Sequence, residues 1–226
     1  MESYQLALDL APPRRLHFSN FLYTDCRAAV ETLRRGLEPG AWYFVAGPAG
    51  CGKTHLAAAV FNQALEAGQQ AQFLPAARLE RATLQAMLES VSCPLLVLDD
   101  VDRLAGDQSL EEVLFHALNR WKADRLTLVM TGTGRNNFQL PDLKSRLGAA
   151  TRLTLKLPDE ALRRRILEQM AGELEMDLRP RALDYLLTHG PRNLRELSGL
   201  METLRGRALG QRRGITVPLI KEVTGQ

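Results

Sequence analysis

The chain has 226 residues, a hydrophobic content of 45% and a formal net charge of +3. This length accommodates one large domain or two small ones with a real core. No apolar run approaches the roughly 18 residues that span a bilayer, and no basic segment followed by an apolar run marks a secretion signal after Met1. Three cysteines and four histidines at irregular spacing exclude a disulfide framework and a metal cluster. The composition predicts a cytoplasmic protein with no membrane partner.

Residues 1–15 are predicted to form a flexible tail. Its segment QLALDL places Leu6, Leu8 and Leu10 in strict alternation after Gln5. The two prolines at 12 and 13 remove backbone donors and disfavour a helix, so the segment is expected to be extended. Alternating leucines on an extended segment either pack on their own domain or enter the apolar pocket of a partner. The residues alone leave both alternatives open.

From residue 42 onward, short apolar runs alternate with longer amphipathic ones. The predicted strands cover 41–47, 70–76, 93–100, 125–134 and 151–157, and the predicted helices between them cover 53–68, 77–90 and 109–123. Ser109, followed by Glu112, is expected to open the third helix as a capping box. This alternation predicts an α/β fold with a parallel five-stranded sheet and helices on both faces.

The strand pattern stops at Pro158. Residues 159–174, 179–190 and 191–210 all have helical periodicity, and the segment 214–223 closes the chain. Before the first strand, residues 16–37 are expected to hold a linker and one helix. The predicted organisation is therefore an α/β nucleotide-binding domain at 16–157 and a small all-helical lid at 158–226.

The segment GPAGCGKT matches the P-loop pattern G-x-x-x-x-G-K-[ST] between a predicted strand and a predicted helix. Its glycines let successive N–H groups point at phosphate oxygens, and the helix adds the positive end of its dipole. Lys53 is expected to reach the β- and γ-phosphates, and Thr54 to hold Mg²⁺ through its hydroxyl. ADP or ATP is the predicted cofactor, together with Mg²⁺. The predicted binding residues are Gly47, Pro48, Ala49, Gly50, Cys51, Gly52, Lys53, Thr54 and His55.

A P-loop requires a carboxylate at the end of another buried strand, and PLLVLDD supplies two. Asp99 is predicted to meet the Mg²⁺ ion, since a buried carboxylate is costly without a metal or water. Asp100 is predicted to polarise the attacking water. Its side chain is shorter than the glutamate used by many such ATPases, so intrinsic hydrolysis is expected to be weak. The next strand ends in TGTG, which offers Thr131 or Thr133 as polar sensor of the γ-phosphate, and Thr133 is preferred.

Two arginines occupy positions suited to a phosphate. Arg146 lies in PDLKSRLG before the fifth strand, and Arg195 lies in PRNLRELSGL at the start of a lid helix. Arginine makes bidentate contacts with phosphate oxygens. Taken singly, each is more often a surface side chain.

The order of these motifs along the chain resembles that of AAA+ ATPases, in the branch of the replication initiator DnaA. This resemblance implies that Arg146 acts in trans, as a finger that completes the nucleotide site of a neighbouring subunit. It also implies that Arg195 senses the nucleotide of its own subunit. The segment LHFSNFLYTDC is similar to the family's Phe-x-x-Phe segment beside the adenine, so Phe18 and Phe21 are expected there.

DnaA-type proteins carry a helix-turn-helix domain after the lid and a long N-terminal domain, and neither is recognisable here. The hexapeptide QLALDL is instead similar to the peptides that bind the bacterial sliding clamp of DNA polymerase III. A short DnaA-like module with such a peptide resembles the Hda family of bacterial replication regulators. That resemblance implies a protein that binds the clamp through Gln5, Leu6, Leu8 and Leu10, often holds ADP, and promotes hydrolysis of ATP on DnaA. Asp9 is expected to weaken clamp binding, because a carboxylate beside an apolar pocket is desolvated for little return.

Two other hypotheses remain open. A stand-alone AAA+ ATPase that loads a helicase or assists transposition would show appreciable turnover, stimulation by single-stranded DNA and no clamp affinity. A scaffold that contacts duplex DNA would use the basic C-terminal third, where residues 151–226 carry 14 basic and 10 acidic side chains. The hypothesis of a clamp-bound regulator, in contrast, keeps the chain's own contact with DNA indirect or weak. It allows a homo-oligomer, because modules with an arginine finger can form head-to-tail rows.

Overall fold

The computed structural model describes residues 12–225, apart from 14, 135, 136, 212 and 213. The predicted clamp-binding residues Gln5, Leu6, Leu8 and Leu10 therefore lie outside the described residues. The described chain forms two compact units. The first contains the sheet and its covering helices and ends at Leu155. The second comprises residues 156–226 with the short segments Leu22–Asp25 and Ala49–Gly52.

The first unit is built on a five-stranded sheet. Its strands are β1 (Trp42–Ala46), β2 (Ala71–Pro75), β3 (Leu95–Asp99), β4 (Thr127–Gly132) and β5 (Thr151–Thr154). They lie in the order β2-β3-β4-β1-β5, and all neighbours are parallel, which confirms the predicted sheet. The register pairs Leu98 with Met130 and Ala46 with Gly132. The carboxyl ends of β3, β4 and β1 therefore meet at one edge.

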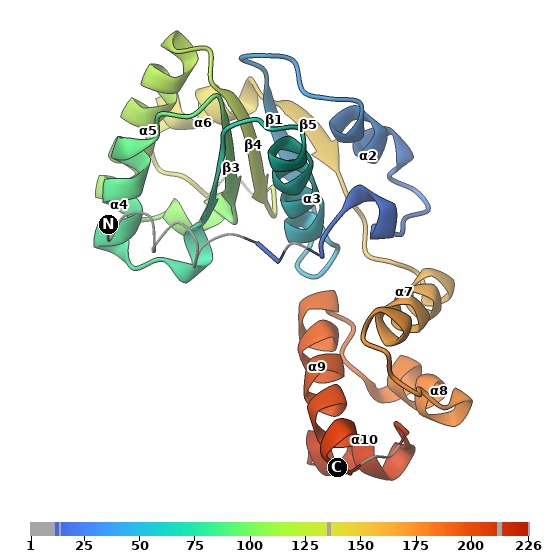
Figure 1. Ribbon diagram of the computed structural model, residues 1–226. Helices are drawn as coiled ribbons and strands as arrows, with labels where there is room; N and C mark the ends of the chain where they lie inside the picture. The colour runs from blue at the N-terminus through green and yellow to red at the C-terminus, as the bar shows by residue number, and fades with distance from the viewer. Residues whose placement is uncertain (1–11, 14, 135–136, 212–213, 226) are drawn as a thin grey trace. The chain divides into compact units, whose positions relative to one another are not determined.

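Helices cover both faces of this sheet, as predicted. They are α2 (Arg27–Arg34), α3 (Lys53–Glu66), α4 (Arg81–Ser90), α5 (Gln108–Ala123) and α6 (Pro141–Gly148). Figure 1 shows α4, α5 and α6 on one face and α2 and α3 on the other. Short 3₁₀ turns η1 (Phe18–Asn20), η2 (Ala76–Arg78) and η3 (Val101–Leu104) complete the unit.

The three central strands β1, β3 and β4 are buried along their whole length, because helices cover both faces of the sheet there. Leu96, Leu98 and Met130 belong to the core formed with α4, α5 and α6, which includes the fully buried Trp121. The alternate strand residues, such as Val97, point to the α3 side and are equally buried. This two-sided burial holds the strand ends, and hence the site, on a rigid base.

Truncation of a central strand residue should therefore be costly. We expect Leu96→Ala to lower the free energy of unfolding by about 2–5 kcal/mol, through lost apolar transfer and a residual cavity. Leu65→Ala is the matched control, since Leu65 on α3 is 46% exposed, and it should change stability by less than about 0.5 kcal/mol. Urea denaturation followed by circular dichroism measures both. Equal effects of the two substitutions would contradict this packing.

Three local predictions need correction. Ser109 does not cap α5: the helix begins at Gln108, and the Asp107 side chain accepts from the Leu110 N–H at 3.2 Å. The helix predicted at 77–90 is divided, because η2 and α4 are separate there. The fifth strand ends at Thr154, three residues earlier than predicted.

The second unit contains the predicted lid helices. They are α7 (Glu160–Glu173), α8 (Pro180–His189), α9 (Leu194–Gln211) and α10 (Val217–Thr224). Buried residues such as Leu167, Leu186, Leu197, Met201 and Ile220 form a core of its own. This confirms the all-helical lid. In the described part of the chain, every helix is too short or too polar to cross a membrane.

Candidate functional site

The P-loop connects the end of β1 to the start of α3, as the motif predicts. Gly50 and Gly52 have φ angles of +77° and +95°, in the left-handed region that favours glycine. The Gly47 N–H donates to the Gly132 carbonyl at 3.1 Å, which anchors the loop to the end of β4. Cys51, inside the loop, is buried. The backbone thus has the tight turn that exposes N–H groups to an anion.

Lys53, the first residue of α3, is only 7% exposed. Its Nζ donates to the carbonyls of Gly47 and Pro48, each at 2.9 Å. A buried ammonium needs such partners, because its desolvation is otherwise costly. The cation is thereby held at the loop, beside the N-terminus of α3.

Asp99 ends β3 and is 2% exposed. The Thr54 Oγ1 lies 3.0 Å from its Oδ2 and 3.2 Å from its Oδ1. The fold thus brings together the two residues that the sequence assigned to Mg²⁺. A hydroxyl and a carboxylate are hard oxygen donors, and Mg²⁺ sites commonly take one or two protein ligands with water and substrate phosphates. The donor set therefore fits this ion. Within the described residues, no cluster of three or more His, Cys, Asp or Glu side chains offers a site of another kind.

Thr131 forms the second link to Asp99. It is fully buried, and its Oγ1 donates to Asp99 Oδ1 at 2.6 Å while accepting from the Asp100 N–H at 2.8 Å. Asp100 adopts the left-handed conformation, with φ 57° and ψ 48°, which is strained for a residue with a Cβ. The Thr131 hydroxyl therefore stabilises both the orientation of Asp99 and the bend at Asp100.

Thr133, the sensor preferred from the sequence, contacts Asp102 rather than Asp99. Its backbone N–H and its Oγ1 both donate to Asp102 Oδ2. Asp102 was not singled out from the sequence, although its place two residues after Asp100 was a usable signal. Among the described residues, its buried Oδ1 finds no hydrogen-bond partner. Asp102 thus ties the end of β4 to η3.

The Phe-x-x-Phe segment packs on α3 beside the P-loop. The Phe21 ring makes an edge contact with the His55 ring, with centroids 5.2 Å apart. The His55 Nε2 lies 3.1 Å from the His17 carbonyl and 3.0 Å from Asn20 Oδ1, so it carries a proton toward these acceptors. Phe18 begins η1 and is partly buried. Three of the predicted cofactor residues, Phe18, Phe21 and His55, therefore belong to one packed region.

The segment is further anchored by Asn62, which sequence reasoning missed. Its Nδ2 donates to the Pro13 carbonyl at 3.2 Å and to the Leu16 carbonyl at 2.9 Å. A buried asparagine in an apolar helix was the available signal, because such a side chain needs partners. Asn62 thus fixes the path of the chain toward Phe18.

The two arginines of the predicted site are both exposed. Arg146 lies on α6, whose residues Leu143 and Leu147 are buried in the core. Arg195 lies in the first turn of α9 in the second unit, where its N–H donates to Asn193 Oδ1 at 2.9 Å. Arg146 is therefore presented to solvent by a helix that is fixed on its opposite face.

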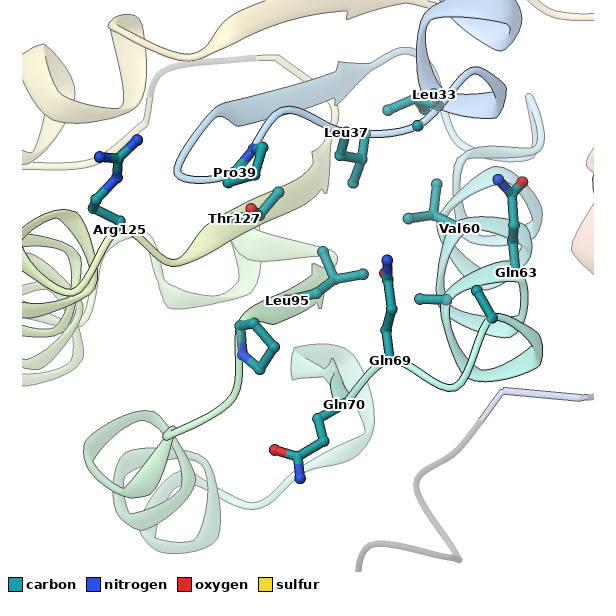
Figure 2. Close-up of a pocket in the computed structure, with 14 residues that line it drawn as sticks. Leu33, Leu37, Pro39, Val60, Gln63, Gln69, Gln70, Leu95, Arg125 and Thr127 are labelled. Atoms are coloured by element: carbon teal, nitrogen blue, oxygen red, sulfur yellow. The ribbon is translucent and has the colours of Figure 1, made fainter.

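A cavity of about 480 Å³ lies elsewhere in the first unit. Its lining includes Leu95 and Thr127, the first residues of β3 and β4, so it is at the other end of these strands from Asp99. In Figure 2, the side chains of Leu37, Val60 and Leu95 converge on it and Gln69 points into it. This cavity is therefore separate from the phosphate site.

A P-loop after the first strand, an acidic strand end and this strand order define the class of P-loop nucleotide-binding folds. Residues 43–171 match the family model of the AAA ATPases, the ATPase family associated with various cellular activities. The chain therefore belongs to the AAA family. Residues 150–224 match the model of the Hda lid domain. The chain is thus a DnaA-related AAA+ protein with an Hda-type lid.

Known relatives agree with this placement. The chain is 27% identical over 238 residues to the chromosomal replication initiator DnaA of Lactobacillus helveticus, across 96% of this chain and 52% of that protein. It thus spans about half the length of this DnaA relative. Its fold is similar to domain III of Thermotoga maritima DnaA, with a TM-score of 0.76 at 21% identity, covering 94% and 96% of the two chains. The AMPPCP-bound DnaA of Aquifex aeolicus gives a TM-score of 0.69 at 24% identity, covering 89% and 68%.

Proposed function

We propose that the chain binds ADP or ATP with Mg²⁺ at the P-loop. This proposal rests on the arrangement of Lys53, Thr54 and Asp99 at the sheet edge where the carboxyl ends of β1, β4 and β3 lie. Lys53 is held at the P-loop, and the Thr54 hydroxyl contacts the Asp99 carboxylate. Backbone N–H groups at Gly50 and Gly52 would contact the phosphates, and Lys53 would exchange its loop carbonyls for phosphate oxygens. Bound Mg²⁺ would neutralise phosphate charge, with Thr54 and Asp99 as its protein ligands. Phe18, Phe21 and His55 would contact the adenine.

Hydrolysis by the chain itself is proposed to be weak. Asp100 would polarise the attacking water, and Thr133 would sense the γ-phosphate. Asp100 has a short side chain, and its backbone is fixed by Thr131 in a left-handed bend. Arg195 in the lid would sense the nucleotide of its own subunit. A nucleotide site of this kind serves to order the protein rather than to turn over substrate.

We further propose that the chain regulates replication initiation by promoting hydrolysis of ATP bound to DnaA. The Hda-type lid and the relation to DnaA support DnaA as the partner. Arg146, exposed on α6, would enter the nucleotide site of DnaA and stabilise the charge that develops during phosphoryl transfer. AAA+ modules that share sites in this way can also associate head to tail, and a homo-oligomer of this chain would use the same geometry.

The N-terminal tail is proposed to bind the sliding clamp in a bacterial cytoplasm. This proposal rests on the QLALDL pattern alone. Gln5, Leu6, Leu8 and Leu10 would fill a pocket on the clamp, so that the clamp, rather than this chain, makes the main contact with DNA.

Clamp binding is tested with the purified chain and a Gln5→Ala/Leu8→Ala variant. We expect the variant to bind the clamp at least about 10-fold more weakly, because one buried leucine contributes about 1.5–3 kcal/mol. A Glu2→Ala/Ser3→Ala variant, changed outside the hexapeptide, is the control and should bind like the original chain. Surface plasmon resonance against immobilised clamp measures all three. If the unchanged chain does not bind the clamp, the proposed role of the N-terminal tail is wrong, and the helicase-loader alternative is favoured.

A further inference from the structure

Glu111 is a fully buried carboxylate that the proposed function does not yet use. It lies in the first turn of α5 with no exposed surface. Its Oε1 accepts from the Gly106 N–H at 2.8 Å, and its Oε2 accepts from the N–H groups of Gln139 and Leu140 at 2.7 and 2.9 Å. All three donors are backbone groups. Hydrogen bonds to an ionised carboxylate are stronger than those between neutral groups.

The three donors come from two different connections. Gly106 follows η3, which continues from the acidic end of β3, whereas Gln139 and Leu140 directly precede α6. Glu111 therefore joins the segment after the predicted metal carboxylate to the start of α6. The helices α5 and α6 are in contact, and Figure 1 shows them on the same face of the sheet.

The start of α6 is held by the buried Phe138 and by Leu140 packed on the core, but its N-cap side chain makes no hydrogen bond. Its N-cap residue is Leu140, whose side chain cannot accept a hydrogen bond, and Pro141 follows as the first helical residue. Glu111 accepts from the N-cap N–H and the preceding N–H, so a residue of another helix binds the backbone where the chain enters α6. Its negative charge also suits the positive end of the helix dipole.

We propose that Glu111 is a positioning residue that sets the direction of α6 and thereby of Arg146. Leu143 and Leu147 fix the buried face of α6, and Glu111 fixes its start. Arg146 lies on the exposed side, six residues after the N-cap. The role of Arg146 rests on the proposed function, whereas the fixation of α6 does not.

The test substitutes Glu111→Gln, which keeps the shape of the side chain. The amide NH₂ must then face a backbone N–H, so at least one hydrogen bond is lost and a donor opposes a donor. We expect amide exchange in the peptide containing Gln139 and Leu140 to become about 10- to 100-fold faster, in hydrogen–deuterium exchange followed by mass spectrometry. Stimulation of DnaA-bound ATP hydrolysis should fall about 10-fold or more, while the chain's own affinity for ADP stays within about twofold.

Glu112→Gln is the matched control, because Glu112 is the next residue of α5 and is exposed. It should leave exchange, stimulation and ADP affinity unchanged. Glu111→Asp, which retains the charge, should restore part of the stimulation. Unchanged exchange at Gln139 and Leu140 in Glu111→Gln, or equal losses of ADP affinity and stimulation, would overturn the positioning role. An unchanged chain that fails to stimulate DnaA would refute the proposed function instead, and the exchange measurement would still decide whether Glu111 fixes α6.

Discussion

Lys53→Ala is expected to reduce affinity for ADP and ATP by about 100-fold or more. In the structure Lys53 Nζ is already held at the P-loop by the Gly47 and Pro48 carbonyls, both at 2.9 Å. A phosphate oxygen would replace these neutral partners with a charged one, and each hydrogen bond to a charged group contributes about 1.5–3 kcal/mol. Two such contacts account for the expected loss. Equilibrium binding of a fluorescent ADP analogue measures it.

The fold should survive this substitution. Removal of the ammonium also removes its desolvation cost, which offsets the loss of its two carbonyl partners. The control is Lys144→Ala on α6, which removes the same charge. This variant should bind nucleotide like the unchanged chain. Full nucleotide affinity in Lys53→Ala would mean that the ligand occupies another site, and the P-loop assignment would be wrong.

Arg146→Ala is expected to abolish stimulation of DnaA-bound ATP hydrolysis. An arginine supplied in trans contributes about 10³–10⁵ to the rate of phosphoryl transfer in enzymes that use one. Because Arg146 is exposed, its removal should not change the melting temperature or the chain's own affinity for ADP. Single-turnover hydrolysis of labelled ATP on DnaA measures the effect.

Lys144→Ala is again the matched control. Lys144 lies on the same helix, two residues before Arg146, so its side chain points to a different face. It should retain stimulation. If Arg146→Ala stimulates DnaA like the unchanged chain, the trans role belongs to another residue or does not exist. If both variants fail, more than one face of α6, rather than one guanidinium, contacts DnaA.

The sheet and the P-loop were predictable from the sequence for a physical reason. A strand buried on both faces must be continuously apolar, and two such runs here end in residues with special chemistry: Gly47 after β1, and Asp99 at the end of β3. Since the carboxyl ends of parallel strands meet at one edge, their proximity followed from topology alone. The helical lid was equally predictable from the sequence, because its helical periodicity begins where the strand pattern stops.

The contacts within the site were less predictable. The difference between Thr131 and Thr133 depends on strand register, since Leu98 pairs with Met130 and so places Asp99 beside Thr131. No local pattern contains that register. Glu111 was hidden for a similar reason: in sequence it is an ordinary acidic residue in the first turn of a helix. Its backbone donors at 139 and 140 are almost thirty residues away.

The start of α5 was predicted wrongly because two neighbouring residues can each cap the helix. Asp107 and Ser109 are both good N-cap residues and lie two positions apart. The structure selects Asp107, whose carboxylate also pairs with Arg81 at 3.0 Å. That partner lies in α4 and cannot be inferred from the α5 sequence. The general lesson is that tertiary partners decide between caps of similar local quality.

The most direct test of the proposed function measures hydrolysis of ATP prebound to DnaA, with this chain and a sliding clamp loaded on DNA. We expect ADP to form on DnaA faster when the chain, the clamp and DNA are all present than when any one of them is omitted. The chain alone should hydrolyse ATP slowly. An unchanged rate of hydrolysis on DnaA, combined with rapid turnover by the chain itself on single-stranded DNA, would contradict the regulatory role and identify a stand-alone ATPase.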